Sequence, residues 1–375
     1  MKGKMKKFSL FMLVLVMALI ITACGKDGGT ATKEDDTVKI MYVNSGTLGE
    51  MGIGDIIMEA LNDFAKETGA QVNVFECHSD ASLFAPTMRD VASTGEYDLI
   101  VTAFYNMKEA VLEAAERYPN QKIILFDSEI DFSGGKYPNV RSVMAKQNEP
   151  GFLAGVLAAL LTQSDAQLAN KEKVVGFVGA AENTAIQDFL IGYIEGVNYV
   201  DSEVNVLYSF VGNWTDTARA KELGLTQYRQ GADVVFAVCG SAGLGVAEAA
   251  RETNNYNIGV DYDFALAIKD TNPRTAEHIV TSAVKDFYNI TMNELESFAD
   301  GSIEWGTHTI YDYARGGSTL VRNEYFDKIV PEDVLKRYEE ITEELAAGKI
   351  KVGTAIGATQ EEIEQFKQQA QPFAR

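Results

Sequence analysis

Short apolar, β-branched runs alternate with amphipathic stretches along most of this chain. Such alternation predicts β-strands separated by α-helices, and therefore βαβ units with parallel sheets. The runs that predict strands are residues 38–43, 72–77, 99–103, 123–126, 174–178, 204–210, 234–238, 258–260 and 280–284. The stretches that predict helices include residues 55–68, 108–117, 185–199, 217–230 and 245–252. Two such series predict two doubly wound α/β lobes.

The first 23 residues differ from this pattern and predict a signal peptide. Four lysines precede residues 8–23, a run of 16 residues without a charge, which is shorter than the about 20 residues of a spanning helix. The run ends Ile21-Thr22-Ala23-Cys24, which resembles a bacterial lipobox. The resemblance implies that Cys24 becomes the acylated N-terminus (diacylglycerol or palmitate chains). The alternative is a non-lipidated signal with an incidental cysteine.

Residues 24–36 (CGKDGGTATKEDD) are small and polar, and they predict a flexible tether between the lipid and the fold. We therefore expect the protein at the cell membrane, lipid-anchored on the extracytoplasmic face. Removing residues 1–23 with their four lysines changes the formal net charge from −21 to −25. An acidic chain of this kind repels polyphosphates, so nucleic acid is excluded as a partner.

The cysteine and histidine content excludes two other classes of site. Three cysteines cannot form a disulfide-dense scaffold, and three histidines without close partners provide no metal site. We expect no cofactor and no metal. Cys77 and Cys239 lie in apolar strands and are interpreted as buried free thiols, with a disulfide between them left open.

Chemically distinctive residues follow the predicted strands, where open α/β sheets bind their ligands. They are Asn44-Ser45-Gly46, Phe104-Tyr105-Asn106, Asp127-Ser128, Gly179, Gly212-Asn213-Trp214, Gly240-Ser241, Asp261-Tyr262-Asp263 and Lys285. Glycine and aspartate at strand ends also serve turns and helix caps. A tryptophan, several aspartates and a lysine together are harder to assign to capping alone, so we expect a ligand site.

Several sequence blocks resemble those of the basic membrane lipoprotein family, the purine-nucleoside-receptor-like substrate-binding proteins of ABC importers. The blocks are GFLAGVLAAL from Gly151, VGFVGA from Val175, FLIGYIEGVNYV from Phe189, GADVVFAVCGSAGLGV from Gly231, IGVDYD from Ile258 and TSAVKD from Thr281. The resemblance implies a periplasmic-binding-protein type I fold, in which two Rossmann-like lobes enclose a ligand cleft and are joined by three hinge crossovers. The lobes would be residues 37–146 plus 286–304, and 147–285 plus 305–375.

The same resemblance implies roles for individual residues. Asp127, Asp261 and Lys285 match positions that hold the ribose hydroxyls of a nucleoside, and charge-assisted bonds of that kind are worth about 1.5–3 kcal/mol each. Trp214 stands where the family has a stacking phenylalanine, and stacking a base is worth about 1–3 kcal/mol. Gly240 would allow close approach of the backbone to the ligand.

The first ligand loop departs from the family pattern. It keeps Asp55 but has Ile53 and Gly54 where the family has phenylalanine and asparagine, and Ile57 lies where a second aromatic residue is expected. Either Phe104, Tyr105 or Asn106 substitutes, or the ligand is not a standard purine nucleoside. Asp55 and Asp263 fit a helix cap as well as a ligand contact.

The predicted function is a monomeric binding protein rather than an enzyme. It captures a nucleoside-like small molecule, with a purine nucleoside favoured, and delivers it to an ABC permease. Two alternatives remain open: a protein of the same fold that binds or senses a sugar or an autoinducer, and a nucleoside-cleaving enzyme on similar lobes.

Overall fold

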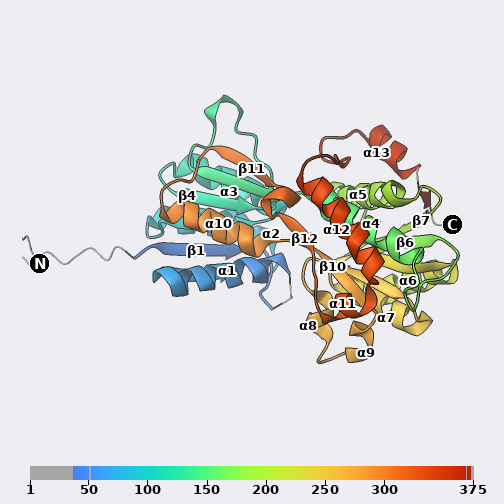
Figure 1. The fold of residues 1–375 in the computed structure, drawn as a ribbon. Helices are drawn as coiled ribbons and strands as arrows, with labels where there is room; N and C mark the ends of the chain where they lie inside the picture. The colour runs from blue at the N-terminus through green and yellow to red at the C-terminus, as the bar shows by residue number, and fades with distance from the viewer. Residues whose placement is uncertain (1–36, 50–51, 369, 373–375) are drawn as a thin grey trace, which may run out of the picture. The chain divides into compact units, whose positions relative to one another are not determined.

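The computed structural model describes residues 37–49, 52–368 and 370–372, so the predicted signal peptide, the tether and Cys24 lie outside the described residues. Two sheets organise the described chain (Figure 1). The first has the strand order β11-β5-β4-β3-β1-β2 and the second the order β12-β10-β9-β8-β6-β7-β13. All pairings are parallel except that of β12 with β10. The two-lobed α/β fold class is confirmed.

The first lobe is a sheet covered on both faces. Its strands are β1 (Lys39–Asn44), β2 (Gln71–Glu76), β3 (Leu99–Ala103), β4 (Lys122–Phe126), β5 (Val140–Ala145) and β11 (Thr307–Tyr311). Its helices are α1 (Ile53–Thr68), α2 (Ala81–Thr94), α3 (Lys108–Arg117) and α10 (Phe287–Ala299), with short 3₁₀ turns at η1 (Tyr105–Met107) and η2 (Ser133–Gly135). Helices α1 and α10 pack together on one face and α2 and α3 on the other, each pair over its own apolar core.

The second lobe repeats this arrangement. Its strands are β6 (Val174–Gly179), β7 (Asn205–Phe210), β8 (Ala232–Val238), β9 (Tyr256–Val260), β10 (Ile279–Lys285), β12 (Ser318–Leu320) and β13 (Gln371–Pro372). Its helices are α4 (Asn148–Thr162), α5 (Thr184–Val200), α6 (Thr217–Arg229), α7 (Gly243–Thr253), α8 (Phe264–Ile268), α9 (Pro273–Ala276), α11 (Glu324–Ile329), α12 (Glu332–Ala346) and α13 (Gln360–Lys367), with 3₁₀ turns at η3 (Gly240–Ala242) and η4 (Tyr313–Arg315). None of the helices in the described part of the chain is long and apolar enough to cross a bilayer.

Helices α4 and α5 pack so closely that only glycine fits between them. An added Cβ at Gly155 would overlap the carbonyl oxygen of Tyr193, and one at Gly196 would overlap that of Phe152. Nearly every residue of α4 is buried, so its sequence is apolar on all sides and shows no helical period. This explains why the hydrophobic pattern did not predict the helix.

Each of the nine predicted strands is present, with ends within two residues of those expected. Cys77 and Cys239 are free and buried, which confirms their interpretation as buried free thiols. One segment differs from the expected lobes: β11 pairs with β5 in the first sheet, although residues 305–311 were expected in the second lobe. A short edge strand with few apolar residues has little sequence signal, and its pairing decides where it belongs. The third crossover therefore lies at residues 312–317.

Candidate functional site

A buried ion pair stands at the carboxyl ends of strands from both sheets. Lys285, the last residue of β10, is 5 % exposed, and its Nζ donates to Oδ1 and Oδ2 of Asp127 at 3.0 and 3.1 Å. Asp127 directly follows β4. Gln147, also buried, has its Oε1 3.5 Å from the same Nζ. Because a buried ammonium needs a partner, Asp127 and Gln147 hold Lys285 in a defined place.

A second carboxylate belongs to this group. Asp261 follows β9, and burial raises its pKa, with Lys285 acting to lower the pKa and Asp127 to raise it further. The three side chains therefore interact electrostatically. Two carboxylates and one ammonium offer both acceptors and donors, which suits a ligand with several hydroxyl groups.

The backbone is strained where these residues leave their strands. Asp127 and Asp261 have φ values of 51° and 70°, in the left-handed region. Phe104, after β3, has φ 79° and ψ 154°, a conformation that is populated almost only by glycine. Such conformations cost about 1–3 kcal/mol each and cluster at functional sites. All three residues were predicted from their positions at strand ends, and the strain is independent support for a site there.

Trp214 and Gly240 lie together at the carboxyl end of the second sheet. A Cβ at Gly240, whose φ is 57°, would lie 3.3 Å from the carbonyl oxygen of Trp214 and 3.4 Å from its ring atom Cε3. Ser241 Oγ and the Ala242 N–H both donate to that carbonyl, at 3.2 and 3.0 Å. The indole is 46 % exposed. Its ring is therefore held over Gly240 with much of its surface available for stacking.

The carboxylates of Asp55 and Asp263 are engaged in local caps. Asp55 accepts hydrogen bonds from the N–H groups of Gly49 at 2.6 Å and Gly52 at 3.1 Å, at the start of α1. Asp263 caps α8 through the Leu266 N–H and accepts two bonds from Asn323 Nδ2, at 2.9 and 3.0 Å. These contacts correspond to the capping alternative, and ligand contacts by either residue stay a prediction.

The three residues after β3 differ greatly in exposure. Phe104 is half-buried against the core of the first lobe, whereas Tyr105 is 82 % exposed and Asn106 is exposed. In the altered first loop, Ile53 and Ile57 are buried in the same core. The loop therefore supplies core contacts at the two positions where the family pattern has aromatic side chains.

Asn44, the last residue of β1, is a candidate that the sequence analysis did not assign. Its side chain is 2 % exposed, and its Nδ2 has no hydrogen-bond partner among the described residues. Its Oδ1 accepts from the Gly46 N–H at 3.3 Å, and Gly54 lies against that oxygen. An unpartnered buried amide costs about 1–3 kcal/mol, which a ligand acceptor would recover. The feature of the sequence that could have identified Asn44 as a site residue was its position at the end of a strand.

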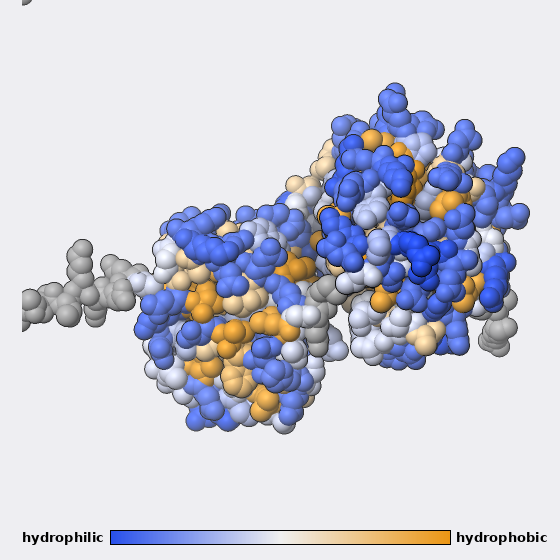
Figure 2. Space-filling view, turned by 90° about the horizontal axis from the view of Figure 1, so that it is seen from below, coloured by the Kyte–Doolittle hydropathy of each residue, from blue (hydrophilic) through white to orange (hydrophobic). Residues whose placement is uncertain are grey.

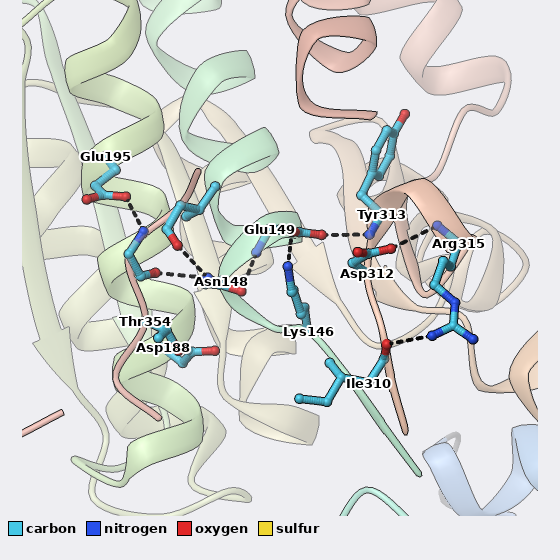
Figure 3. Close-up of polar contacts among 12 residues, drawn as sticks. Lys146, Asn148, Glu149, Asp188, Glu195, Ile310, Asp312, Tyr313, Arg315 and Thr354 are labelled. Atoms are coloured by element: carbon cyan, nitrogen blue, oxygen red, sulfur yellow. Dashed lines mark hydrogen bonds and ion pairs between the residues drawn. The ribbon is translucent and has the colours of Figure 1, made fainter. Parts of the chain in front are cut away.

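The crossovers near the site are joined by hydrogen bonds (Figure 3). Glu149, in the first turn of α4, accepts from Lys146 Nζ at 2.7 Å and from the Tyr313 N–H at 2.6 Å. It thus links the first crossover, which is the connection between β5 and α4 at residues 146–147, to the third crossover at residues 312–317. The Lys146 N–H also donates to the Tyr311 carbonyl at 2.9 Å, and the Asp286 N–H donates to the Gly317 carbonyl at 3.0 Å.

The C-terminal segment is fastened beside this hinge. Asn148 Nδ2 donates to the carbonyls of Val352 and Gly353 at 3.1 and 2.9 Å, and Glu195 accepts from the Gly353 N–H at 2.7 Å (Figure 3). Asp188, fully buried in α5, accepts from Thr354 Oγ1 at 2.6 Å. Burial raises the pKa of both Asp188 and Glu195. Three crossovers were expected from the sequence, but none of these contacts was.

A family model and several curated relatives match this chain. A family model described as "ABC transporter substrate-binding protein PnrA-like" (Bmp) matches residues 37–354. An ABC transporter nucleoside-binding protein, BmpA, of Lactococcus lactis is 25 % identical over 325 residues, covering 82 % of this chain and 89 % of the relative. A CD4+ T-cell-stimulating antigen of Listeria monocytogenes is 28 % identical over 371 residues, covering 93 % and 99 %. An uncharacterized lipoprotein of Pyrococcus horikoshii is 24 % identical over 380 residues, covering 98 % and 86 %.

Solved structures share the fold. A solute-binding protein of an ABC transporter system from Aeropyrum pernix superposes with a TM-score of 0.73 at 21 % identity, covering 88 % of this chain and 98 % of that one. A sugar-binding protein of an ABC transporter from Bacillus halodurans gives a TM-score of 0.59 at 15 % identity, covering 78 % and 100 %. At these identities the likeness concerns the fold alone.

Proposed function

Since the chain belongs to the Bmp family of PnrA-like ABC transporter substrate-binding proteins, we propose that it captures a nucleoside-like ligand, with a purine nucleoside favoured, and delivers it to an ABC permease. The observation that carries the proposal is the group formed by Lys285, Asp127 and Asp261 at the ends of β10, β4 and β9. A neutral polyhydroxyl group fits two carboxylates and a lysine, whereas a phosphate would face the carboxylates.

Each part of the ligand has a proposed contact. The ribose hydroxyls donate to Asp127 and Asp261 and accept from Lys285. The base stacks on Trp214, which the absence of a Cβ at Gly240 allows to lie close to the backbone. The Asn44 amide donates to an acceptor on the base edge, a role that the family asparagine missing at Gly54 would otherwise fill. Phe104, Tyr105 and Asn106 extend the first-lobe side of the site.

Binding is expected to proceed by lobe closure about the three crossovers. Differential affinity of the ligand for the closed state drives such a motion. The hydrogen bonds of Glu149 tie two of these crossovers together.

A ligand panel tests the proposal. Ribonucleosides, free bases, free ribose and other sugars are each added to the protein, and unfolding temperature and calorimetric affinity are measured. A ligand at 100 times its dissociation constant stabilises by about 2.7 kcal/mol, so binding shows as a clear upward shift. Stabilisation by a ribonucleoside, but not by its base or by ribose, supports the proposal. Stabilisation by sugars alone overturns it, and release of free base identifies a nucleoside-cleaving enzyme instead.

A matched pair of variants tests the site itself. Asp261→Asn should lose at least about tenfold in nucleoside affinity because one charge-assisted bond is lost. Asp216→Asn is the control: Asp216 caps α6 on the same lobe by accepting from the Arg219 N–H, and asparagine caps equally well. Equal affinities in both variants would contradict the assignment of Asp261.

We also propose that Cys24 is acylated and anchors the protein on the extracytoplasmic face of the cell membrane. The lipobox supports this, as does the description of the Pyrococcus horikoshii relative as a lipoprotein. Two or more acyl chains give stable anchoring. A mass spectrum of the mature N-terminus should show the acyl chains, and Cys24→Ala should release the protein from the membrane; an unmodified Cys24 refutes the anchor.

A further inference from the structure

Strand β2 forms a free edge of the first sheet. It pairs with β1 through six consecutive residues, from Lys39↔Gln71 to Asn44↔Glu76, without a bulge, and no other described strand pairs with it. Val74 and Phe75 are each 41 % exposed. Figure 2, seen from below, shows apolar residues gathered on the underside of the first lobe, the side on which Figure 1 places β1 and α1. The edge therefore combines unpaired backbone groups with apolar surface.

The equivalent edge of the second sheet is covered. The order β2-β1-β3-β4-β5 in the first sheet corresponds to β7-β6-β8-β9-β10 in the second. There, β13 pairs with β7 through Gln371↔Leu207 and Pro372↔Tyr208. The chain thus closes one of two equivalent edges with its own C-terminal strand and leaves β2 without such a cover among the described residues.

Strand β2 also lacks the features that keep edges apart. Natural edge strands carry lysine, proline, a bulge or an inward-facing charge, because an unprotected edge pairs with another chain. The sequence of β2 is QVNVFE, and its one charged residue, Glu76, is engaged with the Leu48 N–H at 2.6 Å within its own lobe. An edge of this kind is suited to pairing.

The direction of the backbone groups limits how a partner fits. The N–H groups of Gln71 and Cys77 donate to Val38 and Asn44, on the β1 side. By the two-residue alternation of a strand, Val72, Val74 and Glu76 direct their N–H and C=O groups outward. A twofold axis perpendicular to the sheet places outward-facing residues of one copy opposite outward-facing residues of the other. Val74 can then lie opposite Val74 of a second copy, with Val72 opposite Glu76.

We propose that β2 pairs antiparallel with β2 of a second copy, centred on Val74, and joins the two six-stranded sheets into one. This arrangement uses all three outward-facing residues, sets valine against valine at the axis and places no like charges opposite each other. The assembly stops at two copies because the β2 edge of each copy is occupied by that of the other. It replaces the monomer expected from the sequence and does not depend on the ligand.

The net charge predicts how this dimer responds to salt. Each copy carries a formal charge of −21, so two copies repel each other at long range. Added salt screens that repulsion, and the dimer fraction should rise with ionic strength. The tether is a less suitable occupant of the edge, because its residues are mostly glycine, aspartate and other poor strand formers.

Cysteine cross-linking tests the register in the full chain carrying Cys24→Ser, where the remaining thiols, Cys77 and Cys239, are buried. Directly opposed residues of a hydrogen-bonded antiparallel pair have Cα atoms about 5.5 Å apart, within disulfide range. Val74→Cys should therefore form a disulfide-linked dimer on mild oxidation. Asn73→Cys is the control, because it would lie opposite Phe75 and not opposite itself. Equal cross-linking of both variants, or of neither, overturns the register.

Sedimentation over a wide range of concentration and salt tests the association itself. Val74→Lys sets two ammonium groups against each other at the axis and should weaken the dimer about tenfold or more. Ile310→Lys is the control, since Ile310 is 43 % exposed on β11, at the other edge of the same sheet. Nucleoside binding should be unchanged in both. A monomer under all conditions, or a dimer that survives Val74→Lys, refutes the proposal.

Discussion

Replacing Asp233 by asparagine should change how the stability of the second lobe depends on pH. Asp233, in β8, is fully buried. Its Oδ2 accepts from Thr162 Oγ1 at 2.9 Å and from the Asn170 N–H at 2.8 Å, while its Oδ1 has no hydrogen-bond partner among the described residues. Burial raises its pKa from 3.8 to about 6, against the lowering effect of these hydrogen bonds.

The size of the effect follows from that pKa. A difference between 3.8 and about 6, at 1.36 kcal/mol per pKa unit, is roughly 3 kcal/mol. Because the folded state holds its proton more tightly than the unfolded chain, the stabilisation is fully present below pH 3.8. It is lost as the pH rises to about 6, and at pH 7 the buried carboxylate is ionised without full compensation.

Urea unfolding from about pH 4 to pH 7 measures this change. The asparagine of the Asp233→Asn variant would not titrate, and its side-chain oxygen can still accept from Thr162 and Asn170. The free energy of unfolding of Asp233→Asn minus that of the wild type should therefore increase by about 2 kcal/mol across this range, which is most of the full difference. Any constant effect of asparagine on packing cancels in the comparison, as do all other titrating groups.

A variant with the opposite sign serves as the control. Hydrogen bonds from the Glu203 backbone and from Lys173 lower the pKa of Asp201, so Asp201→Asn should lose stability relative to the wild type as the pH rises through the acidic range to the ordinary aspartate pKa of 3.8, and the difference should stay constant above it. Parallel stability curves for Asp233→Asn and the wild type would refute the reasoning. Nucleoside affinity should not change, because Asp233 lies at the start of β8 and the candidate site lies beyond its end.

Three further variants examine the helix packing, the ion pair and the hinge. Gly155→Ala should destabilise by about 1–3 kcal/mol or more, because α4 and α5 must move apart, whereas Gly52→Ala has open space for its methyl group; denaturation of both variants is the measurement. Lys285→Met should cost about 1.5–3 kcal/mol at neutral pH, since the partly buried carboxylate of Asp127 loses its charge-assisted hydrogen bonds; stability unchanged at neutral pH would contradict the pairing. Glu149→Ala should shift ligand affinity severalfold and change the radius of gyration measured by X-ray scattering, while Glu149→Gln, which can still accept from Tyr313, should change both less; identical scattering and affinity would exclude a role in the hinge.

The local pattern of apolar residues was sufficient to predict most strands and to select the charged residues of the candidate site. Strands such as β3 and β4 are fully or almost fully buried, so their apolar runs stand out, and the end of each run marks where a ligand can bind. Asp127, Asp261 and Lys285 were selected in this way. The helix α4 had no amphipathic period because both of its faces are buried, and its close packing on α5 depends on glycines from two distant segments.

The amino-acid sequence alone determined the α/β class, the predicted signal peptide and the strand-end residues, because each depends on neighbours within a few positions in the chain. Only the tertiary structure decided that β11 joins the first sheet, that Lys285 meets Asp127 across 158 positions, and that Glu149 links two crossovers. It also separated the engaged carboxylates of Asp55 and Asp263 from the interacting group around Lys285. Hydrogen bonds and ion pairs act over a few ångströms in space, and no local pattern records which distant segments come within that distance.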